Sequence, residues 1–318
     1  MSARFTEPLA DKIRKTMTMS ARTSTPCNPG GTMDRFFVVT NEIKDPNLEM
    51  TGQITAFLRE HGREVIPVHS WEERIGGLSP LDPDRDCLLV LGGDGTVLDA
   101  AARLREIQIP ILGINMGTLG YLAEIERRNW REALEKVLQG DYDISTRMML
   151  EGHKVFADGR EDPRKEYALN DIVVSRSGSL RVLNITLLVN GQMITRVSAD
   201  GVIAATPTGS TAYNLSAGGP IIEPSSHMIV VTPICSHSMN ARSIVLSSKD
   251  RITLRVEQAQ HSSDIEAEAN FDGARKMLLC QGDRIEIRRA SRETRLIRIS
   301  RQSFLHTLHK KMYQVEGL

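Results

Sequence analysis

The sequence predicts an α+β protein with two domains: a doubly wound α/β domain, then an all-β sandwich-like domain, with a terminal helix that packs back on the first domain. Strand-like and helix-like patterns alternate in the first half of the chain, as they do when helices cover both faces of a parallel sheet. The second half consists of short β-branched runs broken by turn residues, which is typical of a sandwich. The 318 residues are enough for two ordinary domains. We expect a disordered extension over 1–33, the α/β domain over 34–146, the β-sandwich over 147–300 and the terminal helix over 301–318.

The extension is expected because its residues are rich in Ser, Thr, Pro, Gly and Arg and show little apolar periodicity. Such a segment cannot bury enough apolar surface to offset the entropy of ordering it. Met33 directly precedes the first strand-like run, so an upstream start codon is one explanation for the extra residues. Glu7 and Asp11 add the acidic charge that organelle transit peptides avoid.

Strands of the first domain are predicted by apolar runs at 36–39, 64–68, 87–91 and 110–115. The run at 87–91, CLLVL, is apolar throughout, which fits a strand buried on both faces of a parallel sheet. Two helices are predicted from apolar residues that recur on one helical face, and Gly62 and Gly140 end them. The residues of these faces are Met50, Ile54, Phe57, Leu58 and His61 for the first helix, and Trp130, Leu134, Val137 and Leu138 for the second.

The clearest element of the second domain is a hairpin. LNITLLV and QMITRVS flank Asn190-Gly191, the strongest short-range hairpin signal. The last segment, 303–314, returns to helical spacing through Phe304, Leu308 and Met312. Further strands are expected at 227–233, 243–247, 251–257, 283–289 and 295–300.

Composition excludes several classes of partner. The 40 Lys and Arg balance the 40 Asp and Glu, so the chain has no electrostatic footprint for nucleic acid or an anionic membrane. The four cysteines are far apart and form no CxxC pair, which argues against a zinc site or a disulfide scaffold. No apolar stretch approaches the roughly 20 residues of a membrane helix. We therefore expect a cytoplasmic protein.

A glycine turn, LGGDGT at 91–96, lies between the buried strand and a helix. Such turns usually mark phosphate sites, because bare backbone N–H groups and the positive helix end attract an anion. The turn lacks the GKS or GKT of a P-loop and the GxGxxG of a dinucleotide fold. On its own, Asp94 could simply cap the helix through the N–H of Val97.

Two further loops carry polar and small residues. GINMGTLG at 113–120 follows another apolar strand, and turns at the carboxyl ends of neighbouring strands face the crevice where α/β sheets bind ligands. Both glycine loops could also be plain tight turns. TPTGSTAYNLSAGGP at 206–220 is unusually long and polar for a connecting loop. It suits ribose and phosphate groups, with Tyr213 available to stack on a base.

Six stretches, in this order and spacing, resemble bacterial NAD kinases: LGGDGT, GINMGTLGYLAE, LNDIVVSR, SADG, TPTGSTAYNLSAGGPII and PICSHSMNARSIV. The similarity runs from about Phe36 to the C-terminal helix, and TPTGSTAYNLSAGGP is its most specific part. GGDGT is shared with diacylglycerol, sphingosine and phosphofructokinase-like kinases of the same superfamily. The resemblance implies transfer of the ATP γ-phosphoryl group to the 2′-hydroxyl of the adenosine ribose of NAD. It also implies Mg²⁺ or another divalent cation with ATP, and a homodimer or homotetramer.

The resemblance gives Asp94 a role as the catalytic base, because a sugar hydroxyl is a poor nucleophile until a carboxylate accepts its proton. Gly92, Gly93 and Gly95 would let the backbone approach the phosphates, while the cation offsets the repulsion between them and Asp94.

Other positions match the family's binding residues. Asn170 and Asp171 would bind the adenosine end of NAD, although both residue types also favour simple turns. Asp200 would contact the nicotinamide end, and Arg181 could reach NAD from a neighbouring subunit. Asp272 begins a late DG step, where Ala274 replaces the glutamine of some relatives. The full expected NAD- or ATP-binding set is Gly92, Gly93, Gly95, Thr96, Asn115, Asn170, Asp171, Arg181, Asp200, Thr208, Thr211, Ala212, Tyr213, Asn214, Leu215, Ser216 and Asp272.

No resident metal site is expected from the side chains alone. His306 and His309 lack a third ligand and an HExxH frame. Two alternatives to an NAD kinase remain open from the sequence: a lipid kinase of the same superfamily, disfavoured by the polar 206–220 loop, and a non-catalytic NAD(P) sensor, disfavoured by an intact Asp94.

Overall fold

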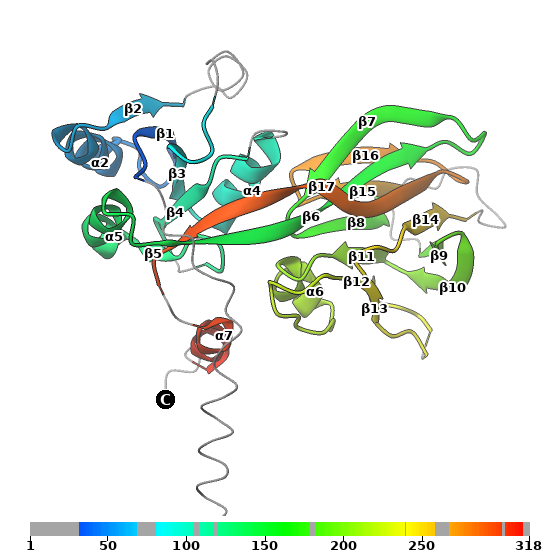
Figure 1. Cartoon of the computed structure of the whole chain (residues 1–318). Helices are drawn as coiled ribbons and strands as arrows, with labels where there is room; N and C mark the ends of the chain where they lie inside the picture. Colours follow the sequence, from blue (N-terminus) through cyan, green and yellow to red (C-terminus); the bar gives the residue numbers. More distant parts are fainter. Residues whose placement is uncertain are drawn as a thin grey trace, which may run out of the picture.

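The computed structural model describes residues 32–68, 81–104, 108–117, 120–178, 182–238, 240–257, 267–300 and 303–313. Most of the expected disordered extension, and Arg181, therefore lie outside the described residues. Met33, which we assigned to that extension, is buried in the core of the first domain. Two domains lie side by side, with α7 (Phe304–Tyr313) below the first (Figure 1). This arrangement confirms the predicted fold class.

The first domain is doubly wound around parallel strands. Their order is β4-β3-β1-β2, and the short β5 pairs with β4. All seven residues of β3 are buried, because α2 and α5 cover one face of the sheet and α4 covers the other. The elements are β1 (Arg35–Thr40), α2 (Glu49–Glu60), β2 (Glu64–Pro67), β3 (Asp86–Gly92), α4 (Asp94–Arg103), β4 (Ile111–Asn115), β5 (Ile125–Glu126) and α5 (Trp130–Leu138).

The second domain is a sandwich whose core takes side chains from both layers. The six-stranded sheet has the order β13-β12-β11-β8-β15-β16, and the other layer contains β7, β6, β17, β14, β9 and β10. The hairpin at Asn190-Gly191 is confirmed, with φ of 52° and 80° at its two turn residues. The strands are β6 (Asp143–Val155), β7 (Glu161–Ala168), β8 (Asp171–Arg176), β9 (Leu183–Val189), β10 (Gln192–Ala199), β11 (Gly201–Ala205), β12 (Met228–Ile234), β13 (Ile244–Ser247), β14 (Ile252–Val256), β15 (Ala267–Phe271), β16 (Arg275–Leu279) and β17 (Arg284–Arg298).

One strand assignment is corrected. The segments 283–289 and 295–300, predicted as two strands, belong to the single strand β17, whose register against β6 shifts between Arg289 and Glu293. The polar residues between the two segments form this irregularity rather than a turn. β17 leaves the sandwich and pairs in parallel with β4 at Leu296 and Ile111. The eleven-stranded sheet is therefore continuous through both domains, and residue 146 lies inside β6.

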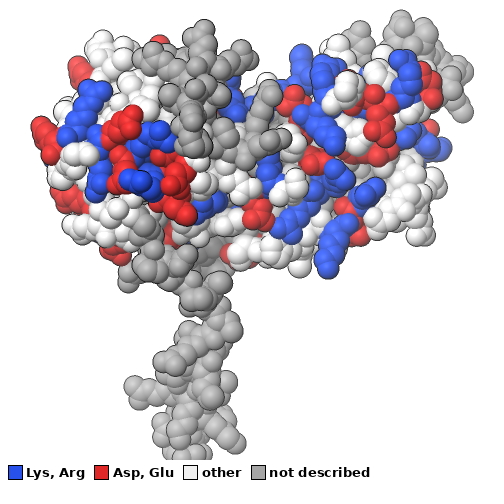
Figure 2. Space-filling model, turned by 45° about the horizontal axis from the view of Figure 1, so that its top comes forward, with Lys and Arg blue, Asp and Glu red and all other residues white. Residues whose placement is uncertain are grey.

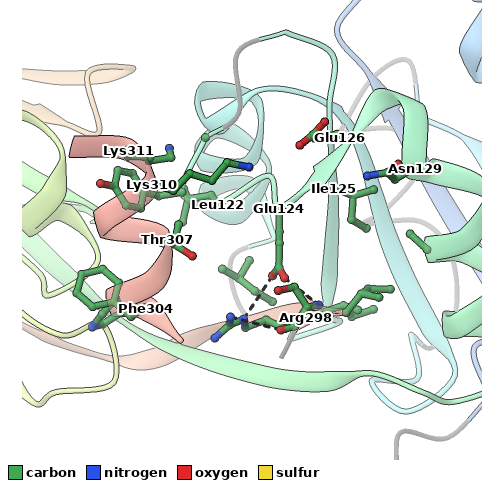
Figure 3. A pocket seen from close by; sticks show the side chains of 18 of the residues that line it. Leu122, Glu124, Ile125, Glu126, Asn129, Arg298, Phe304, Thr307, Lys310 and Lys311 are labelled. Atoms are coloured by element: carbon green, nitrogen blue, oxygen red, sulfur yellow. Dashed lines mark hydrogen bonds and ion pairs between the residues drawn. The ribbon is translucent and has the colours of Figure 1, made fainter. Parts of the chain in front are cut away.

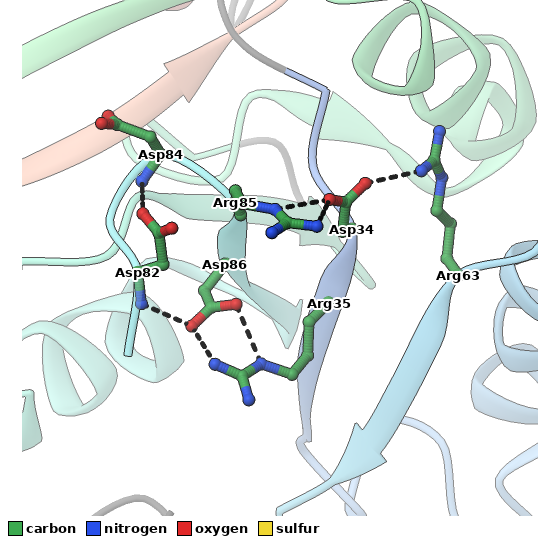
Figure 4. Close-up of polar contacts among 7 residues, drawn as sticks. All are labelled: Asp34, Arg35, Arg63, Asp82, Asp84, Arg85 and Asp86. Carbon is green, nitrogen blue, oxygen red and sulfur yellow. Dashed lines mark hydrogen bonds and ion pairs between the residues drawn. The ribbon is translucent and has the colours of Figure 1, made fainter. Parts of the chain in front are cut away.

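Ion pairs fix the amino ends of β1 and β3, opposite the edge that carries the glycine loops (Figure 4). The Arg35 guanidinium pairs with Asp86 through two contacts of 2.9 and 2.5 Å. This hydrogen-bonded carboxylate raises the pKa of Arg35. Asp34 in turn accepts from Arg63 and Arg85. On the face shown in Figure 2, acidic and basic side chains are interspersed over both domains. Among the described helices, none is long and apolar enough to span a membrane.

Candidate active site

Asp94 is the first residue of α4 and is held by the loop that follows β4. Its carboxylate accepts hydrogen bonds from the backbone N–H groups of Tyr121 (2.7 Å), Leu122 (3.0 Å) and Ala123 (3.0 Å). The interpretation of Asp94 as a mere cap of its own helix is wrong, since the N–H of Val97 bonds instead to the carbonyl of Gly93. Asp94 therefore ties two loops together.

The contact between these loops, and the close turn into α4, both require glycine. A Cβ atom at Gly120 would lie 1.8 Å from Oδ1 of Asp94, and one at Gly92 would lie 2.2 Å from Oγ1 of Thr96. Since β3 and β4 are parallel neighbours with Gly92 opposite Asn115, both glycine loops emerge at the same sheet edge. Thr118 and Leu119 lie outside the described residues.

Lys44 is a site residue that the sequence analysis missed. Its Nζ lies 2.9 Å from the position of a Cβ at Gly93 and 3.4 Å from one at Gly117. The turn that carries it is fixed, because the N–H of Asn41 bonds to the carbonyl of Leu91 (2.8 Å) and Asp45 accepts from Thr51. No carboxylate of the described residues forms an ion pair with Lys44. A single lysine in a loop forms no sequence pattern from which its position beside Gly93 could be predicted.

Two cavities lie on either side of the loop that holds Asp94, and Asp94 itself lines the first of them. The phosphate-loop cavity, of about 670 Å³, is lined by Asn41, Lys44, Gly93, Asp94, Gly95, Thr96, Asp99 and neighbouring residues. The α7 cavity, of about 300 Å³, is lined by Gly120, Tyr121, Leu122, Arg147, Thr208, Thr211 and residues of α5, β17 and α7. Gly120 lines both, so the loop bonded to Asp94 separates the two spaces.

The α7 cavity contains cationic and polar groups whose partners are incomplete. Figure 3 shows Arg298 paired with Glu124, with Nε 3.3 Å from Oε2, and α7 presenting Thr307, Lys310 and Lys311 to the space. Nε of Arg147 and Oγ1 of Thr208 are buried without a hydrogen-bond partner among the described residues. Burial lowers the pKa of Arg147 to about 10. Such groups fit an anionic or polar ligand.

Lys311 connects α7 to the loop that holds Asp94. Its Nζ lies 3.8 Å from the centroid of the Tyr121 ring. Burial lowers the pKa of Lys311, while the nearby charge of Asp94 opposes that shift. The contact agrees with the prediction that the terminal helix packs back on the first domain.

The 206–220 loop is folded tightly rather than open. It contains a 3-10 turn, Gly209–Thr211, and the short α6, Tyr213–Ser216. The Asn214 amide is fully buried and bonds to the carbonyls of Ser210 and Pro220 and to the hydroxyl of Thr232. Asn214 therefore supports the loop from within, whereas Tyr213 is 46% exposed.

The turn at Asn170 and Asp171 lies against this loop. The N–H of Thr206 bonds to the carbonyl of Asn170 at 2.8 Å. A Cβ at Gly209 would lie 2.1 Å from that same carbonyl oxygen. Asp171 is 6% exposed, and burial, with Asp272 nearby, raises its pKa to about 7.

Other expected site residues lie further from Asp94 or are enclosed. Asp200 pairs with Arg176 at 3.4 Å. It lies just before β11, and Thr206 lies just after this strand, which at roughly 3.3 Å per residue is about 17 Å long. Asn115 is 1% exposed, and its Oδ1 accepts from the N–H of Gly117 (2.7 Å). Within the described ranges, His, Cys, Asp and Glu form no cluster of three that could hold a metal.

Comparisons with known proteins show the family of the chain. Family models for the ATP-NAD kinase N-terminal and C-terminal domains match residues 36–142 and 169–299. The NAD kinase of Lachnoclostridium phytofermentans is 41% identical over 282 residues, covering 88% of this chain and 99% of that protein. The NAD kinase of Syntrophotalea carbinolica is 43% identical over 266 residues, covering 81% and 91%.

Solved structures show the same fold. Yeast NADH kinase complexed with NADH superposes with a TM-score of 0.76 at 21% identity, covering 90% of this chain and 89% of that chain. An NAD kinase from Archaeoglobus fulgidus in complex with ATP gives a TM-score of 0.71 at 24% identity, covering 89% and 100%. Fold and site together define a nucleotide-binding phosphotransferase. The chain belongs to the ATP-NAD kinase family.

Proposed function

We propose that this enzyme transfers the γ-phosphoryl group of ATP to the 2′-hydroxyl of the adenosine ribose of NAD and so makes NADP. The observation that carries this function is the position of Asp94, which lines the phosphate-loop cavity and is held by three backbone N–H groups of the loop that separates this cavity from the α7 cavity. A transfer between two nucleotides needs two binding spaces that meet at one base. The relatives that match over most of the chain are NAD kinases.

ATP phosphates fit the phosphate-loop cavity. The amino end of α4 lines this cavity, and the positive end of a helix dipole favours an anion there. Lys44 adds a positive charge above Gly93. Mg²⁺ would fit beside them, with the carboxylate of Asp99 and phosphate oxygens as its ligands, and when bound it would offset the charge of the transferred group.

NAD fits the α7 cavity and the polar loop beside it. The unpaired hydroxyl of Thr208 and the Nε of Arg147 suit ribose and phosphate oxygens, and Tyr213 is exposed for stacking. By family resemblance, Asn170 and Asp171 bind the adenosine end. Asp200 and Arg181 would contribute across a subunit boundary or along an extended dinucleotide.

Asp94 would act as the general base in a direct, in-line transfer. An ionised carboxylate offers about four lone-pair sites, and three accept backbone N–H groups here. One site remains for the ribose hydroxyl. The three donors fix the direction of the carboxylate. Direct attack by the ribose hydroxyl, with Asp94 accepting its proton, requires no covalent intermediate.

The test is to incubate the purified protein with NAD, ATP and Mg²⁺ and to detect NADP⁺ with an NADP-specific dehydrogenase. We expect NADP⁺ that depends on both substrates. Binding of NAD without any NADP⁺ would instead indicate a sensor, and phosphorylation of lipid vesicles without NADP⁺ would indicate a lipid kinase.

Assembly into a homodimer or homotetramer in the cytoplasm belongs to the same proposal. Edge strands β10 and β13 expose apolar side chains: Met193 is 58%, Ile194 46% and Val245 47% exposed. Exposed apolar edges of a sheet favour pairing with another copy.

A further inference from the structure

Asp272 occupies a turn position where an aspartate side chain usually faces water. Asp272, Gly273 and Ala274 join β15 to β16, and the Asp-Gly step, with φ of 50° and 69°, is typical of hairpin turns. Here the carboxylate instead turns inward and accepts the backbone N–H groups of Leu169 (2.7 Å), Asn170 (2.8 Å) and Asp171 (3.0 Å). In return, the N–H of Asp272 bonds to the carbonyl of Asp171 at 3.0 Å.

The Asn170–Asp171 turn is therefore clamped from two sides. Asp272 holds its N–H groups, while the 206–220 loop holds its carbonyls: Oγ1 of Thr206 donates to the carbonyl of Leu169 (2.6 Å), and the N–H of Thr206 to that of Asn170 (2.8 Å). Both contacts leave the side chains of Asn170 and Asp171 out of the clamp. The clamp therefore fixes the backbone of the turn rather than its side chains.

The same hairpin reaches the phosphate loop. Arg275, three residues after Asp272, pairs with Oδ1 of Asp99 on α4 at 3.6 Å, and Asp99 lines the phosphate-loop cavity. The β15–β16 turn therefore lies between the first domain and the Asn170–Asp171 turn. Asp272 itself lines neither described cavity.

This arrangement opposes stability. Two carboxylates, Asp171 and Asp272, lie close together, and burial raises the pKa of both. Like charges that share a poorly solvated site disfavour folding. An arrangement that costs folding free energy is typical of functional sites, where geometry is held against local strain.

We propose that Asp272 is a positioning residue for NAD: it does not touch the dinucleotide but fixes the Asn170–Asp171 turn so that these two side chains meet the adenosine. This inference rests on the proposed function, since it gives that turn the adenosine end of NAD. It replaces the expectation that Asp272 contacts a ligand directly.

The experiment measures steady-state kinetics of the full-length Asp272→Asn variant. An amide keeps the size of the side chain but offers only one acceptor oxygen for three N–H groups. We expect the KM for NAD to rise about tenfold or more, the scale of one lost hydrogen bond to a charged group. The KM for ATP, and the kcat at saturating NAD, should change less than threefold.

Asp283→Asn is the matched control. Asp283 follows the other end of β16, is 4% exposed, and accepts the N–H groups of Ala157 (2.9 Å) and Cys280 (2.8 Å). Its loss should lower the melting temperature while leaving the KM for NAD unchanged. If Asp272→Asn does not fold, Asp272→Glu is the second variant. It keeps the charge but displaces the turn, and it should show the same rise in the KM for NAD.

Two results would overturn the proposal. An Asp272 variant with an unchanged KM for NAD would give the residue a purely structural role. Equal rises in the KM values for NAD and ATP would mean that the whole site had loosened. Failure of the proposed function is distinguishable from both, because the wild-type enzyme would then form no NADP⁺.

Discussion

At the scale of single residues, replacing Asp94 is the most stringent test of the proposed general-base mechanism. Asp94→Asn should lower kcat by at least about a hundredfold, the scale of general-base catalysis, while NAD binding remains measurable. The amide would also turn an N–H group toward the loop donors, so the melting temperature must be measured alongside. Near-normal turnover in a folded variant would remove Asp94 from the role of base.

Lys44 tests the assignment of the two cavities. Lys44→Met should raise the KM for ATP about tenfold, because one charge-assisted contact to phosphate is lost, with little change in the KM for NAD. Lys249→Met, on an exposed turn, is the control and should leave both values unchanged. A rise in the KM for NAD alone would indicate that NAD, and not ATP, binds in the phosphate-loop cavity.

The raised pKa of Asp171 predicts how the stability of the protein depends on pH. Its pKa is raised from its ordinary value to about 7 by burial and by Asp272, so between about pH 4 and 7 the unfolded chain loses a proton that the folded protein keeps. The free energy of unfolding should therefore fall as pH rises through this window. In urea titrations of the ligand-free enzyme, Asp171→Asn should gain stability relative to wild type between pH 5 and pH 8. A difference in the free energy of unfolding between the two proteins that does not change with pH would contradict the raised pKa of Asp171.

At the scale of elements, the pair of Arg35 with Asp86 ties β1 to β3. Arg35→Met leaves Asp86, whose side chain is 3% exposed, without its cation and should lower the free energy of unfolding by about 2 kcal/mol. Arg85→Met removes a partner that is 66% exposed and should lower the free energy of unfolding much less, because solvent screens an exposed pair. Chemical denaturation measures both, and neither variant should change the KM values.

The elements also show what a sequence can reveal. Continuous apolar runs predicted β3 and β4, and Asn190-Gly191 predicted its hairpin, because burial and turn geometry act locally. The continuity of β17 was missed, since the polar residues near Arg292 look like a turn when β6 is not seen beside them. For the same reason the family motifs indicated Asp94, but not Lys44 or the clamp on Asn170: those depend on contacts between distant segments.

At the scale of the whole molecule, the exposed edge of β10 should control assembly. Wild-type protein should elute as a dimer or tetramer in size-exclusion chromatography with light scattering. Met193→Lys places a charge on that apolar edge and should shift the protein toward smaller species. A monomeric wild type would remove the edge from this role.

The sheet that continues through both domains affects how the chain can be divided. The end of β17 supplies Leu296 and Ile297 to the two cores of the first domain, and Leu296 pairs along the edge of β4. A fragment ending near residue 146 would lack both side chains and would leave that edge open to other chains. The core of the first domain is therefore complete only after β17 has been synthesised, although most of that domain is synthesised first.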